Sequence, residues 1–428
     1  MFSKSWRGVL ALACATGAAA WSHPAFATNG YFVNGFDVTQ QGTAGAGLTE
    51  GDGPVSSAEN PAVGVKMGNV AGACMSAFLP YRKAEVGTGS GTNPLTPGEY
   101  SSKDNLFLIP CAGANTLVND KTAVGVSLVA NGGMETYYSQ NPFAGMHTFN
   151  PGFAAASSPL GVNLQQAFVS FNGARTIADG FSIGLAPVFA VQSIRAYGLE
   201  PFEGASQNAG SVTGNGDDWS FGGGLRLGGV WDANRWVSMA AAYQTRMWMS
   251  SFHKYSGLFA DSAKFDIPPE LSLGSTIRPT KGVAVMFDYQ RIFYSQVAAI
   301  GNTELTTAQL GTPNGPGFGW KDMNVYHIGA KWNATDALTL RTGWSYATDI
   351  FNPNEAEFNL ISPGVIKQHV SVGASYKFAP HWTLDGAYTH AFANTVNGLG
   401  NPNFYSGSQP IGLELSEEIA TAGISYRW

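Results

Sequence analysis

Several basic side chains stand at positions from which they could bind an anion. Each falls on the polar face of a segment whose apolar residues recur at every second position. A guanidinium or ammonium group in such a place can pair with the carboxylate of a bound molecule. It can equally pair with an acidic side chain of the same wall, and the sequence leaves both interpretations open. The basic residues concerned are Arg226, Arg246, Lys331 and Arg341.

A second group of candidate binding residues is apolar and lies between two strand-like stretches. Phe252, Tyr255, Leu258 and Phe259 are spaced i, i+3, i+6 and i+7, which predicts an apolar face on a short helix. Exposed apolar patches tend to mark interaction sites, so this face could capture a hydrophobic molecule. The alternative is that it packs on neighbouring loops as a lid.

A pair of glycines could open a sheet locally. Asn131, Gly132 and Gly133 close the third strand-like stretch of the chain. Adjacent glycines permit a bulge or a kink that interrupts hydrogen bonding between neighbouring strands. These residues are therefore a candidate lateral opening, and the alternative is an ordinary turn from strand to loop.

A short element near the N-terminus could hold a fixed shape. Pro61 has a restricted φ angle, and the side chain of Asn60 can satisfy nearby backbone groups. Together with Ala62, these residues are expected to keep the surrounding segment rigid. The alternative is a plain turn.

The sequence does not indicate catalysis. The glycines at 42–47 are not followed by the Gly-Lys-Ser/Thr of a phosphate loop, and the histidines stand singly without metal-ligand spacing. No motif links a nucleophile to a base. The formal net charge is −6, which argues against a nucleic-acid partner. We therefore expect no enzyme activity, cofactor, metal or nucleic-acid partner.

The segments that carry these residues alternate in polarity. Val370, Val372 and Tyr376 share one face of their segment, whereas Ser371 and Gly373 share the other. About nine to eleven tilted residues of strand cross a bilayer, and these segments have that length. We predict fourteen strands, at 70–80, 104–113, 123–131, 165–174, 181–194, 217–231, 236–248, 269–278, 282–292, 322–333, 338–347, 367–379, 382–392 and 416–428.

Short turns and long loops alternate between these strands, and the last strand ends on Trp428. Charged residues are 12% of the chain, roughly half the ~25% of soluble domains. These features are typical of an outer-membrane β-barrel, so we predict an all-β, fourteen-stranded antiparallel transmembrane β-barrel in outer-membrane lipid. A soluble β-sandwich or propeller is the alternative, but the chain shows neither domain breaks nor a blade repeat. The strand ending at Trp428 is the expected contact for the barrel-assembly machinery.

The beginning of the chain has the features of an export signal. Lys4 and Arg7 precede a short apolar run, and Ala25-Phe26-Ala27 is a cleavage site of the A-x-A type. Residues 1–27 are therefore expected to be a signal peptide that directs the protein to the outer membrane.

The rest of the chain is expected to form a plug and a barrel. Residues 28–69 are rich in glycine and lack alternation. They have about the right size to fill a lumen that fourteen strands leave too wide for their own side chains. We predict an N-terminal hatch at 28–69 and the transmembrane barrel at 70–428. Cys74 and Cys111 fall on neighbouring predicted strands and could form a disulfide or remain free thiols.

Several motifs resemble those of one known family. Asn29-Gly30-Tyr31-Phe32, the Gly-rich run at 42–47 and Glu59-Asn60-Pro61-Ala62 are similar to the hatch of the FadL/OmpP1/TodX family of outer-membrane transport proteins. The stretches 254–260 and 265–268 resemble the fourth outer loop of that family and the start of its next strand. The resemblance covers most of the chain beyond the predicted signal peptide.

The resemblance implies a monomeric barrel with an N-terminal hatch. Such a protein takes up long-chain fatty acids, or other hydrophobic compounds such as aromatic hydrocarbons, without an energy source of its own. The ligand is expected to bind among the outer loops, then in a deeper apolar pocket, and to leave sideways at the third strand. A general diffusion porin and a surface-interaction protein that uses loops 81–103 and 132–164 are the competing classes.

Overall fold

A computed structural model describes residues 29–89, 94–403 and 409–428. The predicted signal peptide, with its cleavage site, lies outside the described residues. The described chain forms one antiparallel sheet that closes on itself, because the last strand pairs with the first from Val70–Arg427 to Val86–Ile411.

The wall of the barrel consists of fourteen long strands, as predicted. The sheet has sixteen strands in all, and two of them are short additions: β2 (Gly98–Ser101) pairs with β1, and β9 (Trp248–Met249) pairs with β7. The long strands are β1 (Val70–Val86), β3 (Phe107–Asn119), β4 (Thr122–Glu135), β5 (Gly161–Ala178), β6 (Phe181–Tyr197), β7 (Asp218–Asp232), β8 (Val237–Gln244), β10 (Glu270–Thr280), β11 (Val283–Ile292), β12 (Met323–Asn333), β13 (Leu338–Ala347), β14 (Gln368–Ala379), β15 (Trp382–Leu399) and β16 (Pro410–Arg427).

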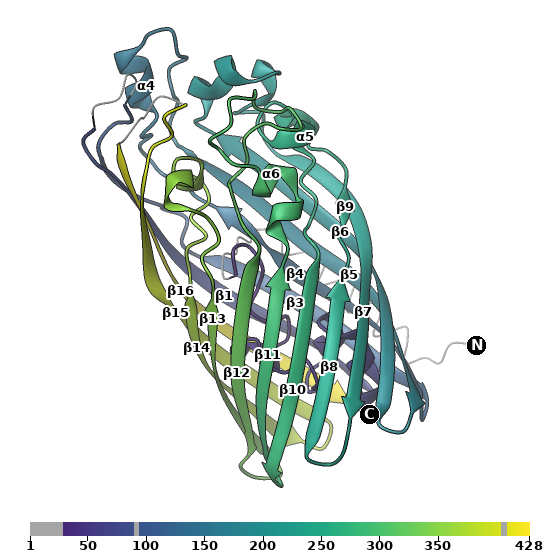
Figure 1. Cartoon of the computed structure of the whole chain (residues 1–428). Coiled ribbons are helices and arrows are strands. Elements are labelled where there is room, and N and C mark those ends of the chain that lie inside the picture. The colour runs from purple at the N-terminus through teal and green to yellow at the C-terminus, as the bar shows by residue number, and fades with distance from the viewer. Residues whose placement is uncertain (1–28, 90–93, 404–408) are drawn as a thin grey trace.

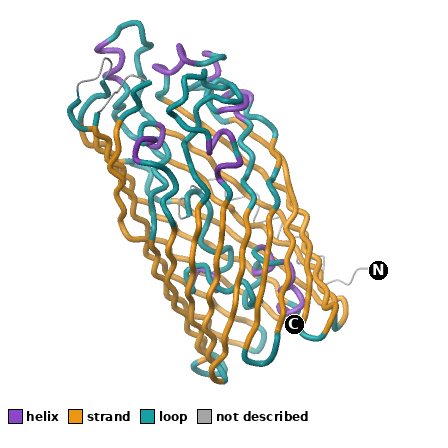
Figure 2. The backbone as a smooth tube through the Cα atoms, in the orientation of Figure 1, coloured by secondary structure: helices purple, strands orange, loops and turns teal. Residues whose placement is uncertain are grey.

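The helices of the described residues are short and lie in two places. Four belong to the segment before the barrel: α2 (Val38–Gln41), η1 (Ser56–Ala58), η2 (Pro61–Val63) and α3 (Gly64–Met67). The others lie in the long loops at one end of the barrel (Figure 2): α4 (Ala144–Phe149), η3 (Glu200–Ala205), η4 (Ala209–Ser211), η5 (His253–Tyr255), α5 (Ala260–Ala263), η6 (Tyr294–Gln296), α6 (Ala298–Gly301), η7 (Pro353–Glu355) and η8 (Phe358–Leu360). Among the described residues, none of these helices has the length and apolarity needed to cross a membrane.

Short turns and long loops occupy opposite ends of the barrel (Figure 1). The turns 120–121, 281–282 and 380–381 connect strands at the lower end of the view. The loops that carry α4, α5 and α6 cover the upper end. This arrangement confirms the predicted alternation of loop lengths.

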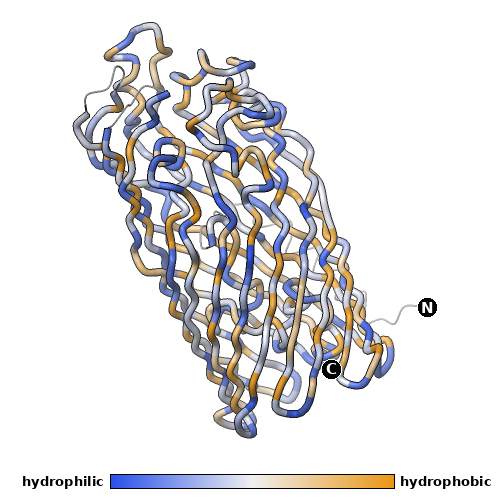
Figure 3. The backbone as a smooth tube through the Cα atoms, in the orientation of Figure 1, coloured by the Kyte–Doolittle hydropathy of each residue, from blue (hydrophilic) through white to orange (hydrophobic). Residues whose placement is uncertain are grey.

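The two faces of the wall differ in polarity, and Figure 3 shows the alternation along each strand. On β14, Val372 and Tyr376 are 52% and 53% exposed, whereas Ser371 and Ser375 are 1% and 9% exposed. Apolar side chains therefore point outward and small polar ones point inward. A soluble protein would bury its apolar face, so this pattern is that of a wall surrounded by lipid.

Residues 29–69, here called the inner segment, lie against the inward face of the wall. Their backbone approaches barrel glycines so closely that an added Cβ would clash: at Gly184, for example, a Cβ would lie 2.3 Å from Ala62 N. Glycine permits this close approach of two backbones. An added Cβ would also lie within 3.0 Å of the inner segment at Gly72, Gly113, Gly132, Gly228, Gly274, Gly329, Gly343, Gly373 and Gly423.

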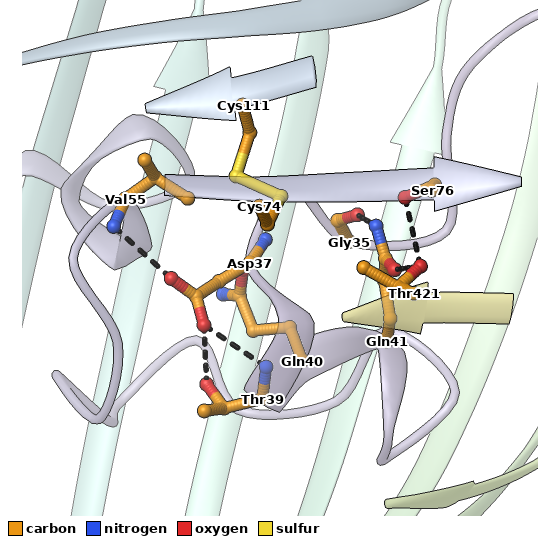
Figure 4. The surroundings of a disulfide bond; sticks show 10 residues. All are labelled: Gly35, Asp37, Thr39, Gln40, Gln41, Val55, Cys74, Ser76, Cys111 and Thr421. Carbon is orange, nitrogen blue, oxygen red and sulfur yellow. Dashed lines mark hydrogen bonds between the residues drawn. A yellow bond between two sulfur atoms is a disulfide. The ribbon is translucent and has the colours of Figure 1, made fainter. Parts of the chain in front are cut away.

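Polar contacts also hold the inner segment. The Asp37 carboxylate accepts hydrogen bonds from Thr39 N at 2.9 Å and Val55 N at 3.0 Å (Figure 4). The Asp288 carboxylate, on β11, accepts the N–H groups of Gly47 at 2.6 Å and Leu48 at 2.8 Å. The segment is therefore fixed both to itself and to the strands around it.

A disulfide joins two strands beside the inner segment. Cys74 on β1 and Cys111 on β3 are direct partners in the strand register, with Cα atoms 4.9 Å apart (Figure 4). Of the two states that the sequence left open, the structure has the disulfide.

Candidate functional site

The wall is interrupted between β3 and β4. Pairing of these strands runs from Asn119–Thr122 to Ala112–Leu128 and ends there. Beyond that point, the first residues of β3, 107–111, pair with β1, whereas the last residues of β4, 129–135, pair with β5. The two strands therefore separate towards the outer end, which leaves a lateral gap in the hydrogen-bonded wall.

The end of β4 turns inward because it binds the inner segment. Val33 N donates to Asn131 O at 3.0 Å, and Phe32 forms an isolated bridge with Gly132. A bulge shifts the β4–β5 register between Ala130 and Gly132. The prediction that Asn131, Gly132 and Gly133 close the strand is wrong, since β4 continues to Glu135.

Glycine is required at the centre of this contact. A Cβ on Gly132 would lie 1.4 Å from the carbonyl oxygen of Tyr31. The backbone of the inner segment could not approach β4 past any larger residue. The glycine signal in the sequence thus reflects a docking point rather than a simple turn.

The rim of the lateral gap is apolar. Phe78, Phe107 and Ile109 form a buried cluster against which Val33 and Ala130 pack. A small cavity beside this cluster is lined by Val33, Gly35, Phe36, Gln41, Cys74, Ser76, Ile109, Pro110, Cys111, Val129 and Ala130. On the lipid side of the same stretch of β3, Leu106 and Leu108 are exposed. Apolar surface is therefore continuous from the lumen to the outside of the barrel at this level.

The four residues of the predicted capture face are all buried. They do not share one helix: η5 covers 253–255 and α5 covers 260–263. The predicted short helix is wrong because the helical turn η5 ends at Tyr255 and the backbone of Phe259 is extended. Phe252, Tyr255, Leu258 and Phe259 instead belong to the large apolar core under the outer loops, which is the lid arrangement that the sequence left open.

Aromatic rings connect that core to the inner segment. The ring centroids of Phe259 and Phe265 are 5.4 Å apart, and those of Phe265 and Tyr31 are 6.3 Å apart. Tyr31 also lies 5.3 Å from Tyr294 and 5.8 Å from Trp320. Burial raises the pKa of the Tyr31 and Tyr294 hydroxyls well above its usual range, so both rings stay neutral. The outer loops and the rim of the lateral gap are thus bridged by neutral rings.

Each of the four predicted carboxylate partners has an acidic neighbour. Lys331 Nζ lies 2.7 Å from Glu50 and 2.9 Å from Asp52, and Arg341 lies 3.3 Å from Asp52. These pairs tie the inner segment to β12 and β13. The remaining two cations pair less closely, Arg226 with Glu270 at 3.8 Å and Arg246 with Asp266 at 3.7 Å. This is the ion-pair arrangement that the sequence left open.

Asn60 is buried at the foot of the inner segment. Its Oδ1 accepts a hydrogen bond from Ala62 N at 3.0 Å, which caps η2 with Pro61 at the first position. Its Nδ2 donates to Leu48 O at 3.0 Å and to Gly229 O on β7 at 3.4 Å. One side chain therefore links two parts of the inner segment to the wall.

A row of buried amides runs along the wall beside the lateral gap and was not anticipated from the sequence. Asn131 Nδ2 donates to Gln166 at 2.9 Å, and Gln166 Nε2 donates to Gln192 at 3.0 Å. Gln192 Nε2 donates to Phe265 O at 2.8 Å. The alternation of side chains along β5 and β6 places Gln166 and Gln192 on the inward face. This alternation is the feature of the sequence from which the row could have been predicted.

Arg82 was also missed, because the first strand was predicted to stop at residue 80. The guanidinium donates to the carbonyl oxygens of Glu135, at the end of β4, and Asp104, just before β3. It lies over the ring of Phe107 at 5.6 Å. Arg82 therefore joins the two sides of the lateral gap at its upper edge.

The comparisons with known proteins agree with this architecture. The family described as "Outer membrane protein transport protein (OMPP1/FadL/TodX)" matches residues 18–410. The chain belongs to this family of outer-membrane transport proteins, which carry hydrophobic compounds and are not enzymes. The resemblance noted in the sequence is thereby confirmed.

One curated relative and several solved structures are similar. The 47 kDa outer membrane protein of Pasteurella multocida (strain Pm70) is 30% identical over 110 residues, which are 26% of this chain and 23% of the relative. The matched part thus spans about a quarter of that relative's length. The toluene transporter TodX of Pseudomonas putida is 16% identical, covering 92% of this chain and 99% of its own, with a TM-score of 0.67. A FadL homologue of Pseudomonas aeruginosa is 15% identical over 93% and 99%, with a TM-score of 0.68. At these identities, the two structures establish the shared fold.

Proposed function

We propose that this protein carries hydrophobic molecules passively from the outer loops to the outer membrane through the lateral gap between β3 and β4. The observation that carries the proposal is that Val33 packs against both the apolar core containing Phe259 and Tyr31 and the rim cluster containing Phe107. Exposing the apolar surface of a molecule to water costs about 25 cal/mol of free energy for each Å². A route that keeps the molecule out of water avoids that cost.

The inner segment would act as the hatch of this route. Its backbone contacts with the wall glycines and its ion pairs to Lys331 and Arg341 oppose an aqueous passage along the barrel axis. The same segment supplies Tyr31 and Val33 to the apolar route. A general diffusion porin would show a large, steady conductance in planar bilayers, whereas we expect a small conductance from the intact protein.

Small neutral aromatic compounds are the substrate class that the route favours. The core is rich in aromatic rings, and the cation at each of the four predicted carboxylate-binding positions has an acidic neighbour within 4.0 Å. Long-chain fatty acids, expected from the resemblance, are the second candidate. Arg246 supports this second candidate, because its side chain is 32% exposed and its distance to Asp266, 3.7 Å, is long for an ion pair.

Binding of toluene and oleate to protein in lipid nanodiscs tests the substrate class. We expect saturable toluene binding that exceeds binding to empty nanodiscs, and oleate binding that depends on Arg246 if fatty acids are also carried. Arg246→Gln would then weaken oleate and leave toluene unchanged. Absence of saturable binding of either compound, together with a large conductance, would replace this proposal with the porin.

The lateral exit can be tested by photocrosslinking. A benzophenone side chain at Leu108, on the lipid face of the gap, should react with a bound radiolabelled aromatic ligand. Val126 is the matched control, because it also faces lipid but lies where β4 is paired with Ala114 of β3. Equal labelling at both positions would argue against exit at this gap.

A further inference from the structure

A group of buried polar side chains lies on the lumenal wall at the upper edge of the lateral gap. Arg82 and Glu417 project inward from β1 and β16, and Glu135 and Tyr138 lie at and after the end of β4. The fractional exposure of each is 5% or less. Charged side chains are rarely fully buried unless they are paired, so the burial of Arg82 and Glu417 calls for a physical explanation.

Glu417 lies between two apolar clusters. In the inward row of β16, it follows Leu415 of the large core and precedes Ile419, which packs on the cluster of Phe78, Phe107 and Ile109. The β1–β16 register pairs Arg82 with Leu415 and Pro80 with Glu417. Arg82 and Glu417 are therefore diagonal neighbours on the same face, within reach of one small group placed between them.

Some polar atoms of this group lack hydrogen-bond partners. Among the described residues, Arg82 Nε has no acceptor, and both carboxylate oxygens of Glu417 have no donor. Arg226 and Arg341, the other buried arginines of the described chain, each have a carboxylate within 4.0 Å, and Arg82 has none. A buried polar atom without a hydrogen-bond partner is costly, which indicates that a further group completes this site.

We propose that Arg82 and Glu417 bind the hydroxyl group of a hydrophobic molecule as it reaches the lateral gap. The inference rests on the proposed route and adds the chemistry of its ligand. A hydroxyl oxygen can accept from Arg82 Nε–H and donate its proton to the Glu417 carboxylate. The body of the ligand would rest on Phe78, Phe107 and Ile109, directly below.

Hydrogen-bonding capacity selects the hydroxyl over the other end groups. A carboxylate ligand can accept from Arg82 but has no proton to donate, so it would leave an oxygen of Glu417 without a donor. A plain hydrocarbon would leave the oxygens of Glu417 without a donor. Phenols, aliphatic alcohols and protonated carboxylic acids share the required hydroxyl, so the test includes one ligand of each class.

The test compares toluene with p-cresol, which differ by one hydroxyl, on protein in nanodiscs. A hydrogen bond to a charged group contributes about 1.5–3 kcal/mol, or a preference for p-cresol of roughly 10- to 100-fold. In Glu417→Leu we expect this preference to fall below about threefold while the toluene affinity is unchanged. The pair 1-octanol and octanoate at neutral pH shows whether aliphatic alcohols are accepted, and octanoate at acidic pH adds the protonated acid.

The matched control is Glu418→Gln. Glu418 is the next residue of β16, but it points to the other face and pairs with His390 at 2.9 Å. It should keep the full preference for p-cresol. If Glu417→Leu does not assemble, Glu417→Gln serves instead and should lower the preference without abolishing it.

The results separate the inference from the proposed route. Saturable toluene binding with no preference for p-cresol, or a preference retained in Glu417→Leu, overturns the hydroxyl site and leaves the route standing. Absence of saturable binding of every compound overturns both. Tighter binding of octanoate than of 1-octanol at neutral pH would also overturn the site, because a carboxylate has no proton to donate to Glu417.

Discussion

Replacement of Gly132 by alanine should separate β4 from the inner segment. The added Cβ would lie 1.4 Å from Tyr31 O, whereas Cβ atoms essentially never approach another heavy atom within 3.0 Å. The two backbones must therefore move apart by about 1.6 Å, the difference between these distances. The neighbouring hydrogen bond from Val33 N to Asn131 O, now 3.0 Å long, would break.

The magnitude follows from the groups that lose their partners. Breaking one buried backbone hydrogen bond and leaving its donor and acceptor without partners costs about 2–5 kcal/mol. Even the lower figure reduces the population of the docked arrangement about thirtyfold relative to the undocked one. If the docked β4 forms the exit, hydrophobic uptake should fall by at least about tenfold.

The assay is the initial rate of toluene transfer into lipid by reconstituted protein, with heat-dependent gel migration as the check that the barrel is folded. Gly173→Ala is the control, because Gly173 lies on β5, beside β4, and its added Cβ would meet nothing closer than Leu185 O at 3.9 Å. Wild-type transfer in a folded Gly132→Ala barrel would refute the reasoning. It would mean that the contact between β4 and the inner segment does not shape the exit.

Three further predictions concern the parts that hold the route together. Asn60→Ala should destabilise the inner segment by about 0.5–2 kcal/mol through loss of its cap and raise the single-channel conductance in planar bilayers, which an unchanged conductance would contradict. The double variant Cys74→Ala and Cys111→Ala should lower the free energy of unfolding by about 4 kcal/mol, since the disulfide closes a loop of 37 residues; urea titration measures it. Burial and the nearby carboxyl of Glu357 raise the pKa of Glu304 well above its usual range, so the folded loops favour the protonated acid. Loop stability should be greatest in acid and fall as the pH rises, and limited proteolysis should lose this pH dependence in Glu304→Gln.

Alternation and loop length predicted the barrel well because the wall obeys a local rule. Side chains of a strand point to opposite faces, so a wall between lipid and lumen imposes a period of two. The errors came where other forces interrupt that period. The first strand was predicted to end at residue 80 but continues to Val86, so the prediction did not place Arg82 on the wall. A bulge between Ala391 and Asn394 similarly hid the outer part of β15.

The site was harder to predict because it depends on contacts between distant segments. The glycines at 132 and 133 were identified, but only the approach of Tyr31, about a hundred residues earlier, shows why they are needed. Burial of Phe259 likewise depends on Phe265, Phe318 and the inner segment rather than on helical spacing. Periodicity reports which face a residue occupies, and it does not report what lies opposite that face.

The inner segment decides which kind of passage the barrel can provide. A barrel of fourteen strands without a plug would hold a water-filled lumen, which a hydrophobic molecule avoids. In the proposed function, the segment blocks that lumen: it contacts the wall glycines, and its first residues bind the end of β4. Blocking the aqueous route and shaping the lateral one are thus consequences of the same contacts. A substitution that loosens these contacts, such as Gly132→Ala, should therefore raise ion conductance while it lowers hydrophobic transfer. If separate parts of the protein controlled ion conductance and hydrophobic transfer, one substitution would not be expected to raise the first and lower the second.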